Sequence, residues 1–112
     1  MFQRSVPPGL PSPPIDLVAV AVGGCQVLLA WGEGEAGDLG FRIERTAGND
    51  LHGSYEKIGD VGPHVTAFRD GSVKPGTSYS YRVHAWGQSG DSSSSNVVDV
   101  VSPSAGTDPL FE

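Results

Sequence analysis

The residues best suited to contact a ligand lie in the segment SYSYRVHAW, which runs from Ser78 to Trp86. Apolar and polar residues alternate along it, and Arg82, His84 and Trp86 share the face opposite the apolar one. Such alternation is typical of a strand with one buried face. An exposed tryptophan beside arginines can anchor a glycan or a protein partner. The same pattern arises when arginine side chains cover an aromatic ring at the rim of a sheet, so both interpretations stay open.

Metal binding and catalysis find little support in the residue spacing. The three histidines are His52, His64 and His84. Their spacing does not match that of zinc ligands. One loop carries the acidic residues Glu33, Glu35 and Asp38. Their order does not match a calcium loop. We find no nucleophile elbow, phosphate loop or supported Cys/His pair, and therefore expect no metal, no cofactor and no enzyme activity.

Composition and charge exclude further classes of protein. A length of 112 residues predicts one domain, and the formal net charge of −6 with no basic block argues against a nucleic-acid partner. The single cysteine, Cys25, excludes an internal disulfide, and we expect it to be a small, at least half-buried residue. No apolar run approaches the ~20 residues of a membrane helix. The N-terminal residues lack the apolar core of a secretory signal, so the chain is either intracellular or part of a longer protein.

Short segments separated by turns predict an all-β fold. The expected strands are 15–20, 25–31, 41–46, 55–61, 65–70, 78–86 and 94–101. About seven strands at this spacing, with no segment of helical periodicity, predict an antiparallel sandwich of two sheets with immunoglobulin-like architecture. Five prolines between Ser5 and Pro14 favour an extended linker. We therefore divide the chain into a Pro-rich linker (1–13), a sandwich domain (14–102) and a linker-like tail (103–112).

The order of these segments resembles a fibronectin type III domain between about Pro14 and Ser102. The family has a proline-led first strand, a tryptophan on the second, an aromatic-x-aliphatic pair on the third and a Leu-x-Pro-x-Thr-x-Tyr turn. The corresponding residues here are Pro14, Trp31, Phe41 with Ile43, and VKPGTSY with Val73 in the leucine position. The segments FRIER and TAFRDGSVKPGTSYSYRVHAW resemble variants found beside secreted bacterial enzymes.

The resemblance implies roles for individual residues. Tyr79 takes the place of the tyrosine corner, whose hydroxyl bonds the backbone a few residues upstream. Trp31 is expected to pack between the sheets, against Ile43 and Tyr79. The expected core residues are Trp31, Phe41, Ile43, Tyr79, Tyr81 and Val83. The third strand would lie beside the Tyr79 strand and add Arg42 and Glu44 to the outward face. The possible ligand or partner contacts are therefore Arg42, Arg82, His84 and Trp86.

Three roles are compatible with this resemblance. We expect first a non-catalytic spacer or docking module of a larger extracellular, bacterial protein, monomeric in isolation and contacting its neighbouring domains. The second role is a binding module for polysaccharide or a surface protein, acting through the face with Trp86. The third is a structural subunit of a phage tail or surface filament. Ser89, Gly90 and Asp91 fall where some family members carry Arg-Gly-Asp, but the arginine is missing, so integrin binding is not inferred.

Overall fold

The computed structural model describes residues 11–34, 39–47 and 54–104, and these residues contain strands and loops but no helix. The strands are β1 (Ile15–Ala21), β2 (Val27–Gly32), β3 (Gly40–Ala47), β4 (Glu56–Val61), β5 (Ala67–Asp70), β6 (Ser78–Gly87), β7 (Gly90–Ser94) and β8 (Val98–Val101). The described residues therefore include no helix that could span a membrane.

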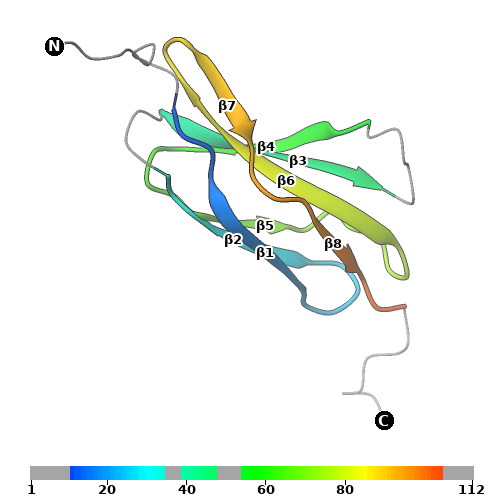
Figure 1. Cartoon of the computed structure of the whole chain (residues 1–112). Helices are drawn as coiled ribbons and strands as arrows, with labels where there is room; N and C mark the ends of the chain where they lie inside the picture. Colours follow the sequence, from blue (N-terminus) through cyan, green and yellow to red (C-terminus); the bar gives the residue numbers. More distant parts are fainter. Residues whose placement is uncertain (1–10, 35–38, 48–53, 105–112) are drawn as a thin grey trace, which may run out of the picture.

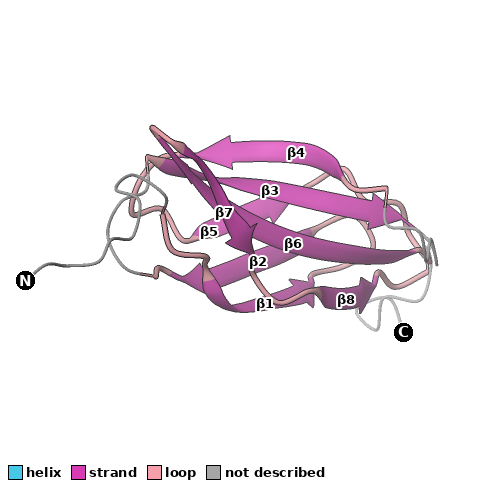
Figure 2. Cartoon of the chain, turned by 45° about the horizontal axis from the view of Figure 1, so that its top comes forward, coloured by secondary structure: helices cyan, strands magenta, loops and turns pink. Residues whose placement is uncertain are grey.

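The strands form two antiparallel sheets packed face to face (Figures 1 and 2). The small sheet has the order β1-β2-β5. The large sheet has the order β4-β3-β6-β7, with β8 also paired to β6. The expected all-β, two-sheet antiparallel sandwich is thus confirmed.

The core lies between the two inner faces and is formed by alternate residues of the long strands. The six residues expected there, Trp31, Phe41, Ile43, Tyr79, Tyr81 and Val83, are all buried. The Trp31 ring meets the Phe41 ring edge to face, with 5.7 Å between centroids. The Trp31 indole nitrogen is buried without a hydrogen-bond partner, so this side chain stabilises the fold through apolar contact alone.

The segment after β6 differs from the sequence expectation of one strand at 94–101. Of that range, Val98–Val101 forms the strand β8, and a separate strand, β7, precedes it at Gly90–Ser94. β7 pairs with the end of β6, and β8 pairs with its beginning. The side chains of Ser92 in β7 and of Ser95 just after it accept hydrogen bonds from the backbone N–H groups of Ala85 and Val83, at 2.9 and 3.1 Å. Serine oxygens thus satisfy β6 donors where the ladder register shifts.

Ser95 provides a direct test of this arrangement. Its side chain is buried, so Ser95→Ala would leave the Val83 N–H without that acceptor. We expect the free energy of unfolding in urea to fall by about 1–3 kcal/mol. The matched control is Ser93→Ala, an exposed position two residues away, where a change within about 0.5 kcal/mol is expected. Equal effects of the two substitutions would contradict the bracing role of Ser95.

The lone cysteine was expected to be at least half-buried, and this expectation was wrong. Cys25 is exposed in the β1–β2 turn. The chain turns there through Gly23, whose φ of +74° is readily adopted only by glycine. The strand β2 consequently begins at Val27 rather than at Cys25.

The described chain begins and ends at opposite ends of the sandwich (Figure 1). At the beginning, Pro11 and Pro14 are buried. A Cβ placed on Gly34 would come within 2.6 Å of the Ser12 Cβ. The residues that precede β1 therefore pack directly against the chain after β2. At the other end, Ser102 is fully buried and its hydroxyl donates to the Lys74 carbonyl. Both ends of the domain are therefore held against its body.

Candidate binding face

The outer face of the large sheet brings together the four residues singled out as possible contacts. In the β3–β6 register, Gly40 lies opposite Trp86, Arg42 opposite His84, and Glu44 opposite Arg82. All of these side chains are of the parity opposite to the buried Phe41, Ile43 and Val83, so they face outward. We call this surface, with its neighbours on β4 and β7, the charged face.

Trp86 lies at the rim of the charged face and is half-buried. A Cβ on Gly40 would come within 2.8 Å of the Trp86 indole nitrogen, so the absence of a side chain at Gly40 gives the ring its place. The Arg42 guanidinium lies over the ring, 5.1 Å from its centroid. One face of the tryptophan is thus already occupied by a cation.

The arginines of the charged face are neutralised within the domain. Arg42 pairs with Asp91 at 3.0 Å and with Asp60 at 3.5 Å. Arg82 pairs with Glu44 at 2.6 Å. The Arg82 guanidinium also lies 4.0 Å from the centroid of the Tyr55 ring. Each arginine therefore has a carboxylate and an aromatic ring as neighbours.

His84 lies between two carboxylates on this face and is largely covered, with 12% of its side chain exposed. Its Nδ1 is 3.8 Å from Glu44, and its Nε2 is 3.4 Å from Asp91. The Nε2 atom is buried and forms no hydrogen bond with good geometry. His84 therefore lies against both acids and does not present a free imidazole.

Four members of the charged face were not assigned to it by sequence reasoning: Tyr55, Lys57, Asp60 and Asp91. A signal for Asp91 was present: the turn between Gly87 and Gly90 has two residues, and Gly is typical of such hairpins. That turn places Asp91 opposite Trp86. The pairing of β4 with β3, which brings Asp60 opposite Arg42, is a long-range contact with no local signal.

A second polar cluster lies between the sheets and centres on Asp70, whose side chain is 3% exposed. Its carboxylate accepts hydrogen bonds from Arg45 at 2.8 Å and from the Tyr81 hydroxyl at 2.7 Å. The hydroxyl and backbone N–H of Ser72 bond the other oxygen, at 2.7 and 3.0 Å. Asp70 is on the small sheet, whereas Arg45 and Tyr81 are on the large one, so this cluster joins the two sheets.

These contacts set the protonation behaviour of the cluster. Burial raises the pKa of Asp70, but hydrogen bonds from Tyr81, Ser72 and Arg45 outweigh it and hold this pKa below its ordinary value. Burial and the hydrogen bond to Asp70 raise the pKa of Tyr81 far above its ordinary range. The carboxylate and the neutral phenol are therefore the stable forms at neutral pH.

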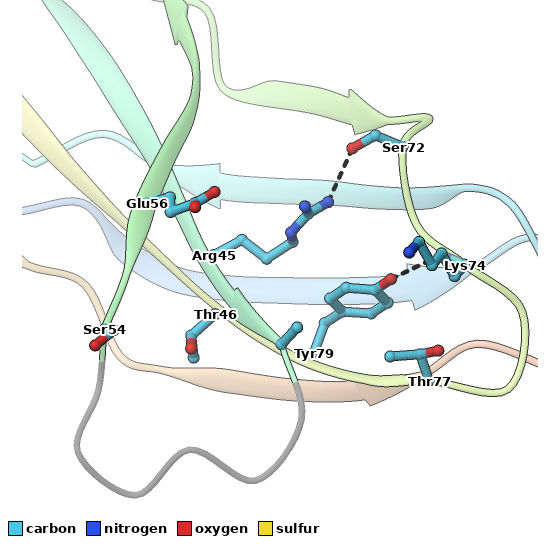
Figure 3. Close-up of a pocket in the computed structure, with 9 residues that line it drawn as sticks. Arg45, Thr46, Ser54, Glu56, Ser72, Lys74, Thr77 and Tyr79 are labelled. Carbon is cyan, nitrogen blue, oxygen red and sulfur yellow. Dashed lines mark hydrogen bonds between the residues drawn. The ribbon is translucent and has the colours of Figure 1, made fainter.

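Beside this cluster an open hollow of about 430 Å³ lies at the end of the sandwich where β6 begins (Figure 3). Tyr79 lines it, and its hydroxyl accepts the Lys74 backbone N–H at 2.7 Å, as the tyrosine corner implies. The Arg45 guanidinium lies 4.9 Å from the centroid of the Tyr79 ring. Arg45 is already bonded to Asp70 and Ser72, so its guanidinium has a structural role at this hollow.

Within the described ranges, no group of three or more His, Cys, Asp or Glu side chains could hold a metal ion. His64 lies against Glu33 at 3.2 Å, in an exposed pair. Glu35, Asp38 and His52 lie outside the described residues.

Comparisons with known proteins bear on the fold. No protein-family model matches the chain. No curated protein matches it in sequence. Among solved structures, the FN5 domain of Drosophila Lar is 23% identical, with a TM-score of 0.69 over 85% of this chain and 99% of the other. The fibronectin type-III domain of human fibronectin type III domain containing protein 3 is 21% identical, with a TM-score of 0.69 over 88% and 93%. The chain has the fibronectin type III fold.

Fibronectin type III domains stand beside other domains in several of these structures. The chicken CNTN1 FN1-FN3 structure matches with a TM-score of 0.74 and 19% identity, over 83% of this chain and 32% of that one. The chain thus spans about a third of this larger relative. The fibronectin type III fold is characteristic of non-catalytic modules of multidomain proteins. Fold alone does not determine which partner such a module contacts.

Proposed function

We propose that this fibronectin type III domain is a spacer and docking module that holds neighbouring domains at a set separation in a longer, extracellular bacterial protein. The extracellular, bacterial part of this proposal rests on the resemblance of the third to sixth strand segments to modules found beside secreted bacterial enzymes. The spacer role rests on the structure of the two ends.

The observation that carries the spacer role is that the chain enters and leaves at opposite ends, each held by specific contacts (Figure 1). β6 has ten residues, so the sandwich separates its ends by about 33 Å at ~3.3 Å per residue. The side-chain amide of Asn96 exchanges two hydrogen bonds with the backbone of Leu17, at 2.9 and 3.0 Å. The Gly76 N–H bonds the carbonyls of Ser102 and Pro103 at 3.1 and 3.0 Å. A domain whose two ends are held in this way would fix the position of one neighbouring domain relative to the other.

The alternative, a polysaccharide or surface-protein site at Arg42, Arg82, His84 and Trp86, has less support. A ligand would have to displace Arg42 from Trp86 and separate arginines from their carboxylates. Polymer pull-down tests this alternative. Retention of the wild type on an insoluble polysaccharide, with loss in Trp86→Ala, would establish the binding face, and we expect no retention. The third role, as a subunit of a phage tail or filament, has no specific contact in its favour.

The spacer role predicts a narrow distance distribution between the two ends. Spin labels at Ser12→Cys and Ser104→Cys, on a Cys25→Ser background, would report this distance by pulsed electron resonance. We expect a single narrow peak for the otherwise native chain. We expect a clearly broader peak for Ser102→Ala, because the Lys74 carbonyl and the Thr77 N–H lose their contact with the hydroxyl.

Ser93→Ala is the matched control, because that position is exposed, and its distribution should equal that of the native chain. A native distribution as broad as that of Ser102→Ala would contradict the spacer role.

A further inference from the structure

The outer face of the small sheet is apolar, in contrast to the charged face on the other side of the molecule. Exposed aliphatic side chains follow one another across β1 and β2: Ile15 is 50% exposed, Val18 55%, Val20 58% and Leu28 41%. The register places Val20 beside Leu28, and Val18 beside Ala30. We call these five residues, Ile15, Val18, Val20, Leu28 and Ala30, the apolar face.

Both faces of these strands are apolar, which is unusual for a half-buried sheet. Leu17, Val27 and Leu29 are buried toward the core, while the apolar face carries aliphatic residues at the alternate positions. Near-continuous apolar strands are typical of sheets covered on both sides. Contiguous exposed apolar patches are characteristic of interaction sites. The pattern therefore indicates that something covers the apolar face.

The covering contact is made face to face rather than by strand addition at the β1 edge. The β1 register shifts between Ile15 and Val18, and Asp16 within this bulge has a φ of +57°. A bulge and a charged residue at an edge both oppose pairing with a further strand. Neither feature opposes a contact with the outward face of the sheet.

The size of the apolar face limits what can cover it. Its two strands, ~4.8 Å apart, and a length of seven residues at ~3.3 Å each give roughly 220 Å². A stable complex of separate proteins needs about 800 Å² on each partner. Two copies, each with a formal net charge of −6, would also repel one another. A partner domain in the same polypeptide can bind through a smaller area, because its effective concentration is in the millimolar range.

A positive charge beside the apolar face indicates what kind of side chain the partner carries. Arg69 on β5 borders the apolar face beside Leu28. It is exposed and forms no ion pair with another described residue, whereas Arg42, Arg45 and Arg82 are all paired. A partner that carries a carboxylate beside its apolar surface would complete this site.

We propose that the apolar face docks an adjoining domain of the same longer polypeptide, through an apolar surface that presents an Asp or Glu to Arg69. This inference rests on the proposed spacer and docking function, and it names the surface that makes the docking contact.

The experiment measures how fast a thiol reagent reacts with a cysteine at Val20, on a Cys25→Ser background. The rate is compared between the 112-residue chain and the full-length polypeptide that contains it. We expect Val20→Cys to react at least tenfold more slowly in the full-length polypeptide. The control, Lys57→Cys on the charged face, should react equally fast in both. Adding Arg69→Glu in the full-length polypeptide should restore fast reaction at Val20→Cys, and Arg69→Lys should not.

Equal rates for Val20→Cys in both proteins would overturn the docking proposal. If the spin-label distances were still narrow, the spacer function would stand without it, so the two failures are distinguishable. Sedimentation of the 112-residue chain provides the second measurement. We expect a monomer at several hundred micromolar, and a dimer abolished by Val20→Lys would assign the face to a second copy and overturn the proposal.

Discussion

Replacing Asp70 with alanine is expected to lower the free energy of unfolding by about 3–5 kcal/mol, because it leaves Arg45 without its partner between the sheets. The pair is largely buried, with 3% of the Asp70 side chain and 18% of the Arg45 side chain exposed. The Tyr81 hydroxyl and Ser72 would lose their acceptor as well. Urea denaturation measures the effect, and Arg69→Ala, the exposed neighbour on the same strand, should change stability by less than about 0.5 kcal/mol.

The effect of Asp70 should depend on pH with a definite sign. Its pKa in the folded protein lies below the ordinary value, so its contribution is fully present above the unfolded-state pKa of about 3.9. The contribution is lost as the pH falls through the lower, folded-state pKa. The difference in stability between the native chain and Asp70→Asn should therefore shrink toward acid pH. A difference that is constant from pH 7 to pH 2 would contradict the role of the carboxylate charge.

Replacing Trp31 with alanine is expected to lower the free energy of unfolding by about 3–5 kcal/mol, a large part of the stability of a domain of this size. The side chain is 6% exposed and packs against Phe41 at the centre of the core. Trp31→Phe should cost clearly less, because the buried indole nitrogen has no hydrogen-bond partner to lose. Thermal and urea unfolding measure both variants.

The second tryptophan is the matched control for this experiment. Trp86→Ala removes a half-buried ring from the rim of the charged face and should cost no more than about 1 kcal/mol. We expect this large difference in stability because the Trp31 side chain faces the core from β2, whereas the Trp86 side chain faces outward from β6. Similar losses for both would show that Trp86 belongs to the core.

Most of the fold could be predicted from local pattern. Alternation along Ser78–Trp86 predicted the longest strand and which of its residues are buried, because successive side chains of a strand point to opposite faces. The same rule placed Trp86, His84 and Arg82 on the outward face, and the structure has them there beside Arg42. The tyrosine corner at Tyr79 came from the resemblance to fibronectin type III domains, and its hydrogen bond to Lys74 is present.

The neutralisation of the charged face could not be predicted in this way. Glu44 was expected on the outward face, but the pairs themselves join residues far apart in the sequence. Asp91 is 49 residues from Arg42, and Glu44 is 38 residues from Arg82. Pairing between distant residues depends on sheet register. The strand β7 was missed for a related reason, since serine side chains in it and just after it replace backbone acceptors.

The amino-acid sequence by itself determined the strands, their buried sides and the sandwich architecture, because the two-residue period of a strand is local. Tertiary structure alone decided which charges meet, and therefore that the arginines of the charged face are neutralised. The inward-facing Asp70 shows the difference most clearly. Its position on a strand is readable from alternation with Phe68, but only the packing of the two sheets brings Arg45 and Tyr81 to its carboxylate. Coulombic and hydrogen-bond energies depend on distances in space, which the order of residues does not contain.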